Sequence, residues 1–250
     1  MKIVSAKIVS YGLRFREPLR SVHGVVETRE GFLLCLEDAS GRRGWGDAAP
    51  WSGFGTDARA VQRTLDGLQR EEGPLCGTSF RSLNEIKQWM ATRPLPAETS
   101  YAVELALLDL LAQEESKSVS ELFSPEPRSM LELHSLVDNA ENADQAVRKG
   151  ARSLKIKVGF NSIDDDLARL QSIRKKVGPD IGLRVDAGAA WDPQTAMQAA
   201  LKFRTVGLEW LEQPVAARDL EVMATIRKEA KVAIAVDEGV QRLEDLERAI

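Results

Sequence analysis

Apolar positions in the first part of the chain alternate with polar ones in short runs, and later recur every three or four residues. The first spacing is typical of β-strands and the second of amphipathic helices. Strands are predicted at 2–11, 31–36 and 44–47, with a turn cluster at 38–41. Helices are predicted at 56–70 and 101–113. Residues 1–125 therefore predict an α+β domain.

From about residue 131, short apolar strands alternate with helices. Strands are predicted at 133–137, 153–158, 182–185, 208–211 and 232–236. Helices are predicted at 139–149, 164–176, 193–206, 219–228 and 243–250. The regular spacing favours a (β/α) barrel of the TIM type over a doubly wound sheet, which would usually carry a Gly-rich phosphate loop. Residues 126–250 thus predict an α/β barrel domain.

The predicted barrel domain is shorter than a complete barrel. About five β/α units fill residues 126–250, whereas a closed barrel has eight. Three more units would take roughly 72 residues at the same spacing, and an open sheet would leave two unpaired edges. We therefore expect either a truncated product or a barrel that strands from elsewhere complete, and a homo-oligomer is among the expected assemblies.

Composition and charge narrow the class of protein. The 250 residues carry a net charge of −4 at a pI near 5.5, which excludes the basic surface of a typical nucleic-acid-binding protein. The longest apolar runs are far shorter than a membrane span, and the N-terminus lacks a signal-peptide pattern. Cys35 and Cys76 have no metal-ligand spacing and form no disulfide framework. We expect a cytoplasmic protein that binds neither nucleic acid nor membrane.

Acidic side chains end three consecutive predicted strands, at Asp186, Glu212 and Asp237. The carboxyl ends of parallel barrel strands surround one mouth, so these carboxylates should converge there. They would repel one another unless a cation lay between them, and oxygen ligands without His or Cys suit a hard divalent ion. The pattern predicts a Mg²⁺ site, with Mn²⁺ as the alternative metal.

Two lysines lie on the strand that precedes these carboxylates. Lys155 and Lys157 are two residues apart, so both side chains should lie on one face of the strand. A nearby divalent cation would lower the pKa of at least one lysine and make it a usable general base. Such a base beside a metal that holds a carboxylate can remove the α-proton and stabilise the enediolate. The predicted partner is a small-molecule carboxylate substrate.

Together these residues resemble the enolase superfamily, specifically its muconate-lactonizing subgroup. The resemblance extends over nearly the whole chain and is carried by the stretches SLKIKVG, LRVDAGAAW, LEWLEQPV and AIAVDEG. It implies that Lys157 is the catalytic acid/base and that Lys155 is its electrostatic companion. It also implies that Asp186, Glu212 and Asp237 are the metal ligands.

The resemblance implies that residues 1–125 form a capping domain, and their sequence is similar to one family of the subgroup. The stretch REGFLLCLEDASGRRGWGDAAPWSGFGTD looks like an o-succinylbenzoate synthase, in which a loop near 50–56 closes over the substrate. Gly53, Phe54 and Gly55 would then be the substrate-binding lid. The implied lyase reaction of menaquinone biosynthesis removes water from a cyclohexadiene hydroxy carboxylic acid and yields 2-succinylbenzoate.

Other activities of the superfamily use the same lysine and carboxylates. N-succinylamino acid racemase, dipeptide epimerase and muconate cycloisomerase are the enzyme alternatives, and an inactive or partner-dependent homologue is the non-enzyme alternative. A racemase needs a second lysine across the substrate, which the subgroup keeps on a sixth unit. Gly188 and Gly239 stand where the family commonly has Asn and Ser, and neither position carries the primary chemistry.

Overall fold

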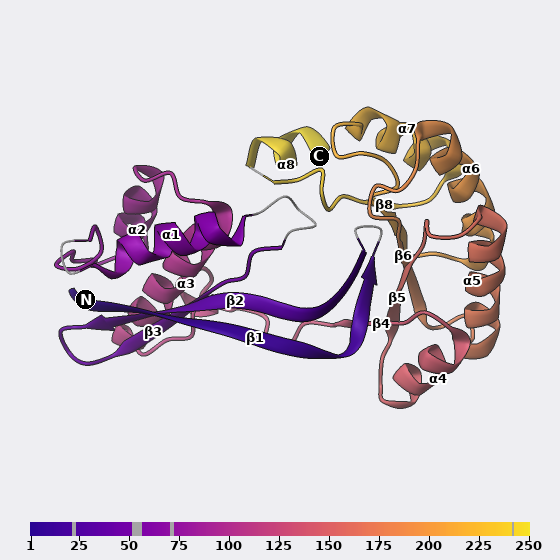
Figure 1. The fold of residues 1–250 in the computed structure, drawn as a ribbon. Coiled ribbons are helices and arrows are strands. Elements are labelled where there is room, and N and C mark those ends of the chain that lie inside the picture. Colours follow the sequence, from indigo (N-terminus) through magenta and orange to yellow (C-terminus); the bar gives the residue numbers. More distant parts are fainter. Residues whose placement is uncertain (22–23, 52–56, 71–72, 242) are drawn as a thin grey trace. The chain divides into compact units, whose positions relative to one another are not determined.

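The computed structural model describes residues 1–21, 24–51, 57–70, 73–241 and 243–250 (Figure 1). The chain forms two compact units, Met1–Ser129 (unit 1) and Met130–Ile250 (unit 2), and each has its own hydrophobic core. No helix among the described residues is long and apolar enough to cross a membrane.

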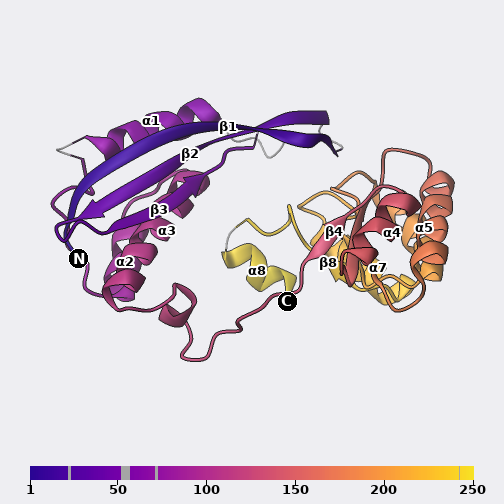
Figure 2. The same cartoon turned by 90° about the horizontal axis from the view of Figure 1, so that it is seen from below.

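Unit 1 is an antiparallel sheet packed against helices (Figure 2). Its strands, in spatial order, are β1 (Ile3–Ser21), β2 (Gly24–Asp38) and β3 (Arg43–Ala48). Its helices are α1 (Ala58–Gln69), α2 (Leu83–Ala91), α3 (Ala97–Glu114) and a 3₁₀ turn (Ser120–Leu122). Apolar residues of the sheet, such as Leu34 and Leu36, are fully buried in one cluster with residues of the three α-helices.

Two parts of unit 1 exceed the prediction from sequence. The strands β1 and β2 stay paired up to Ser21 and Gly24, far beyond the predicted strand ends. There Leu13 and Val25 are 64% and 54% exposed, so this part of the ribbon has no buried face and no apolar alternation to reveal it. Helix α2 was also not predicted, although Leu83, Ile86, Trp89 and Met90 recur at helical spacing and pack in the core of unit 1.

Strand β3 packs directly on the backbone of α3, and two glycines allow this approach. A Cβ on Gly46 would lie 1.8 Å from the carbonyl oxygen of Ala102, and one on Gly44 would lie 2.2 Å from that of Ala106. Ala102 and Ala106 are one helical turn apart, so small residues face one another on both elements. The Gly-Trp-Gly sequence of β3 therefore sets the distance between sheet and helix.

Unit 2 is a parallel α/β unit whose strands follow one another in space in chain order. The strands are β4 (His134–Leu136), β5 (Ser153–Lys157), β6 (Gly182–Asp186), β7 (Trp210–Glu212) and β8 (Ile234–Ala235). The helices are α4 (Ala140–Arg148), α5 (Ile163–Val177), α6 (Pro193–Phe203), α7 (Leu220–Ala230) and α8 (Leu243–Ala249), with a 3₁₀ turn at Arg204–Val206. Helices α4 to α7 lie on the same side of the sheet (Figure 1), as right-handed crossovers in sequential order require.

This order confirms the predicted parallel α/β arrangement and differs from a doubly wound sheet, in which the strand order reverses at one point. Closure into an eight-stranded barrel stays a prediction, because the described sheet consists of five strands.

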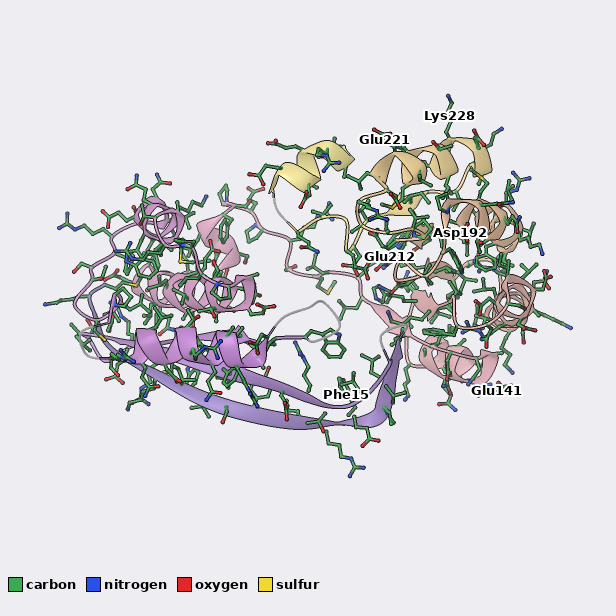
Figure 3. All side chains as sticks on the ribbon, turned by 45° about the horizontal axis from the view of Figure 1, so that its top comes forward. Phe15, Glu141, Asp192, Glu212, Glu221 and Lys228 are labelled. Atoms are coloured by element: carbon green, nitrogen blue, oxygen red, sulfur yellow. The ribbon has the colours of Figure 1, made fainter. Side chains whose placement is uncertain are left out.

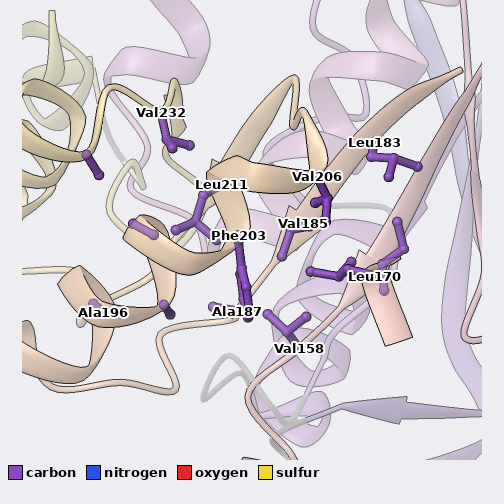
Figure 4. Packing of buried hydrophobic residues seen from close by; sticks show 14 of the residues in the cluster. Val158, Leu170, Leu183, Val185, Ala187, Ala196, Phe203, Val206, Leu211 and Val232 are labelled. Carbon is purple, nitrogen blue, oxygen red and sulfur yellow. The ribbon is translucent and has the colours of Figure 1, made fainter. Parts of the chain in front are cut away.

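The core of unit 2 lies between the sheet and its helices (Figure 4). Leu154, Ile156 and Val158 alternate along and just beyond β5 and are fully buried, and Leu183 and Val185 do the same on β6. Because side chains alternate between faces, the intervening residues of these strands must lie on the opposite face. That face carries the charged residues.

Replacing Gly46 by Ala should lower the free energy of unfolding by about 2–3 kcal/mol, because the backbones of β3 and α3 would have to separate. Urea unfolding followed by circular dichroism measures this change. The matched control is Gly67→Ala in α1, where a Cβ would meet nothing within 4 Å. That variant should be more stable by about 0.5–1 kcal/mol, because Ala favours the helix. Equal stability of Gly46→Ala and the wild type would contradict the close packing.

Candidate active site at the carboxyl ends of the strands

The register of the parallel sheet aligns three of the predicted site residues. Lys157 on β5 is the pairing partner of Asp186 on β6, which in turn pairs with Glu212 on β7. Glu212 pairs with Ala235 on β8, and Asp237 follows two residues later. Figure 3 shows Glu212 on the side of the sheet away from the helices, whereas Glu221 and Lys228 project from the outside of α7. The charged row thus lies at one end and on one face of the sheet.

Two lysines and two carboxylates form an ion-pair cluster in this row. Lys155 Nζ donates to Glu212 Oε1 at 2.5 Å and lies 2.9 Å from Asp186 Oδ2. Lys157 Nζ donates to the same Asp186 oxygen, also at 2.9 Å. The Asp186 side chain is 3% exposed, while those of Lys155 and Lys157 are 16% and 29% exposed. Of the two amines, Lys157 is therefore the more accessible to a ligand.

Opposite charges shift two pKa values in the cluster. Burial alone would raise the pKa of Asp186, but hydrogen bonds from Lys157 and Lys155 hold it below its ordinary value. Burial alone would lower the pKa of Lys155, but its hydrogen bonds to Glu212 and Asp186 raise it above its ordinary value. Lys155 therefore stays protonated and acts as a fixed positive charge.

The three predicted metal ligands do not form a ready-made metal site in the described part of the chain. The Asp237 side chain is exposed, and the described residues include no group of three His, Cys, Asp or Glu side chains arranged to hold a metal ion. Its neighbour Glu238 is half-buried, and Glu238 Oε2 is buried without a hydrogen-bond partner among the described atoms. Burial raises the pKa of Glu238, and the charges of Asp237 and Asp186 raise it further. Negative charge is thus in excess at this end of the sheet.

This donor set fits a hard divalent cation. All the acidic groups that meet here offer oxygen, and a buried carboxylate oxygen without a partner is a group that a cation would satisfy. Lys155 forms ion pairs with Asp186 and Glu212, whereas Glu238 Oε2 has no hydrogen-bond partner among the described atoms. The residues are therefore compatible with the predicted magnesium site.

Gln213 was missed by the sequence reasoning, although it directly follows Glu212. Its side chain is fully buried, and its Oε1 accepts from the backbone N–H groups of Asp237 at 2.9 Å and Gly239 at 3.1 Å. Its Nε2 donates to the carbonyl of Val215 at 2.9 Å. One amide thereby ties the end of β7 to the segment that follows β8. The signal available in the sequence was a polar residue between a strand end and Pro214.

Gly188, where the family commonly has Asn, supports Asp186 through its backbone. Its N–H donates to Asp186 Oδ1 at 2.9 Å, and its φ of +51° is a value that glycine adopts readily. Both oxygens of Asp186 are thus engaged, one by this N–H and the other by lysines. The predicted lid residues Gly53, Phe54 and Gly55 lie outside the described residues.

Comparisons with known proteins show which sequences and folds this chain is similar to. Residues 138–250 match a family model described as enolase C-terminal domain-like. The N-succinyl-L-Arg/Lys racemase of Bacillus cereus is 26% identical over 259 residues, which cover 100% of this chain and 69% of the racemase. The substrate-liganded L-Ala-D/L-Glu epimerase from Bacillus subtilis has a TM-score of 0.89 at 28% identity, covering 99% of this chain and 71% of the epimerase.

An o-succinylbenzoate synthase is a less similar structure. The enzyme from Thermosynechococcus elongatus, complexed with Mg in its active site, has a TM-score of 0.71 at 25% identity, covering 98% of this chain and 72% of the synthase. The racemase and epimerase alternative is therefore better supported than the dehydration that the N-terminal stretch led us to expect.

Replacing Gln213 by Leu should lower the free energy of unfolding by about 1–3 kcal/mol, because two N–H groups and one carbonyl would lose their partner at nearly constant side-chain volume. Urea unfolding checks this. Gln194→Leu is the control, since Gln194 is exposed on α6, and it should change stability by less than about 0.5 kcal/mol. A Gln213→Leu variant that matches this control would show that the amide does not hold the segment.

Proposed function

We propose that this chain is a Mg²⁺-dependent enzyme of the enolase superfamily in which Lys157 removes the proton α to a substrate carboxylate, and the match of residues 138–250 to an enolase C-terminal domain-like family model supports this. The observation that carries the proposal is the division of labour between the two lysines. Lys155 is held by two carboxylates with a raised pKa, while Lys157 contacts Asp186 and is the more exposed of the two.

The chain's own residues would share the work of this proton transfer. Neutral Lys157 Nζ would take the α-proton and become an ammonium, while the C–H electron pair moves into the substrate carboxylate as an enediolate. Protonated Lys155 would stabilise that developing negative charge from a fixed position. Asp186, Glu212 and Asp237 would hold Mg²⁺, with the unpartnered Glu238 beside them. When bound, this ion supplies positive charge next to the carboxylate of the substrate.

We propose an N-acylated amino acid or a dipeptide as the substrate class. This rests on the names of the similar proteins, an N-succinyl-L-Arg/Lys racemase and an L-Ala-D/L-Glu epimerase. In both types of molecule, a free carboxylate lies next to a carbon that carries an amide nitrogen. That arrangement gives the metal a carboxylate and gives Lys157 an α-proton.

Dehydration to 2-succinylbenzoate is the second candidate. The stretch before residue 57 and the likeness to the synthase from Thermosynechococcus elongatus favour it. An elimination that produces an aromatic ring can run on one lysine, so Lys157 would be the base in this reaction also. Assays with both substrate classes separate the two candidates.

Mg²⁺ should bind to the wild-type chain and bind at least tenfold more weakly after Asp186→Asn, because a metal ligand would lose its charge. Isothermal titration calorimetry measures both affinities. Asp192→Asn is the matched control, because Asp192 caps α6 and Asn is an equally good cap. Its affinity should stay within twofold of the wild type. Equal binding to the Asp186→Asn variant would remove Asp186 from the metal site.

Lys157→Ala should lower the rate of α-proton exchange in D₂O by about 10²–10⁴, the usual effect of losing a general base. Proton NMR of L-Ala-L-Glu and N-succinyl-L-lysine with Mg²⁺ follows the exchange without requiring a second lysine. Lys228→Ala, an exposed change on α7, should leave the rate unchanged. If Lys157→Ala keeps more than about a tenth of the wild-type rate, Lys157 is not the base and Lys155 is the next candidate.

A further inference from the structure

An ion pair on α5, between Arg169 and the fully buried Asp166, binds the backbone on the C-terminal side of Lys157 without touching its amine. Asp166, in the first turn of α5, is 0% exposed, and its Oδ1 accepts from Arg169 Nη2 at 2.7 Å. Its other oxygen, Oδ2, accepts from the backbone N–H of Gly159 at 2.8 Å. A fully buried carboxylate is costly unless it is paired and hydrogen-bonded, so its partners are specific.

Arg169 binds the other end of this short segment, so that Asp166 and Arg169 together bracket the backbone of residues 157–159. The Nη2 that binds Asp166 also donates to the carbonyl oxygen of Lys157 at 2.7 Å, and Nη1 donates to the carbonyl of Asp138 at 3.2 Å. The pair therefore grips the carbonyl of residue 157 and the N–H of residue 159 together. Between them, Val158 N–H donates to the Asp186 carbonyl at 2.8 Å.

The end of the neighbouring strand explains why Lys157 needs this support. On the β4 side, the last pairing partner is Leu136 opposite Lys155, and Val137 N–H donates to the Lys155 carbonyl. The Lys157 carbonyl points to the same side, because carbonyls two residues apart in a strand are parallel. By then the neighbouring chain has turned into α4, so Arg169 occupies the place of a strand donor. Gly159, with φ of +91°, begins the turn away from the sheet.

We propose that Asp166 and Arg169 are positioning residues for Lys157. They fix the carbonyl of residue 157 and the N–H of residue 159, and the position of this strand end sets the direction in which the Lys157 side chain leaves the strand. This rests on the proposed function, in which Lys157 is the base. A shift of about 1 Å in a reacting group can cost on the order of 10² in rate while the binding groups stay in place. Loss of the bracket should therefore lower kcat and leave KM and Mg²⁺ affinity nearly unchanged.

The test compares Arg169→Met, which keeps the stem and removes the donors, with Arg148→Met on α4. Arg148 also pairs with a carboxylate on its own helix, Asp144 at 3.0 Å, but is 76% exposed. With L-Ala-L-Glu or N-succinyl-L-lysine and saturating Mg²⁺, the kcat for α-proton exchange should fall by about 10–100-fold in Arg169→Met. KM and the calorimetric Mg²⁺ affinity should stay within threefold. Arg169→Lys should recover at least threefold of the lost rate, and Arg148→Met should match the wild type.

A second measurement tests the hydrogen bonds of Asp166 and Arg169 to this backbone without an activity assay. Amide hydrogen exchange by NMR should be at least tenfold faster at Val158 and Gly159 in Arg169→Met and unchanged in Arg148→Met. The inference is overturned if these amides keep their protection, or if Arg169→Met keeps the wild-type kcat while Lys157→Ala abolishes exchange. If Lys157→Ala itself keeps the wild-type rate, the proposed function fails instead, and the amide measurement alone decides whether Asp166 and Arg169 hold this backbone.

Discussion

The alternation of side chains along the parallel strands of unit 2 is the constraint on which the rest of its structure depends. Leu154 and Ile156 face the helices, so Lys155 and Lys157 must lie on the other face of the sheet. The same rule separates Val185 from Asp186 and Leu211 from Glu212. Hydrophobic burial on one side thus fixes the position of the charged row on the other. A register slip of one residue would bury the lysines among the helices.

Given that row, the balance of charge determines what each group can do. Two lysines between two carboxylates leave Asp186 ionised and Lys155 protonated, so neither is free to exchange a proton near neutral pH. Glu238 has one buried oxygen without a partner among the described atoms, and its pKa is raised by burial first and then by the charges of Asp237 and Asp186. A bound divalent cation would give this oxygen a partner, and Lys157, the more exposed of the two lysines, would then be the amine open to a substrate.

Hydrogen bonds between side chains and backbone N–H groups hold the strand ends around this row. Gln213 holds the N–H groups of Asp237 and Gly239, Gly188 holds Asp186, and Asp166 holds Gly159. Such contacts cover strand ends, where the hydrogen-bond ladder of the sheet stops and its groups need other partners. The site is consequently built where the regular structure ends, and its precision depends on these replacements for the ladder.

The strands and helices of unit 2, and the face on which its charged row lies, follow from the amino-acid sequence alone. Lys155, Lys157, Asp186 and Glu212 could be placed on one face from their positions alone, because alternation and parallel register are local and repeated. The distal β1–β2 ribbon was not predicted because its residues have no buried face, and helix α2 was not predicted although Leu83, Ile86, Trp89 and Met90 recur at helical spacing.

Which charged and polar groups contact one another depends on the packing of strands and helices. Lys155 pairs with Asp186 and Glu212, which lie on two other strands. Asp166 and Arg169 of α5 bind the backbone that follows Lys157 on β5. The exposed position of Asp237 is likewise seen only in the folded chain. Their contacts depend on how strands and helices stack, and on where one strand stops beside another. The spacing of hydrophobic residues along the sequence predicts which face of each element is buried. It does not predict which residue of another element lies across from that face.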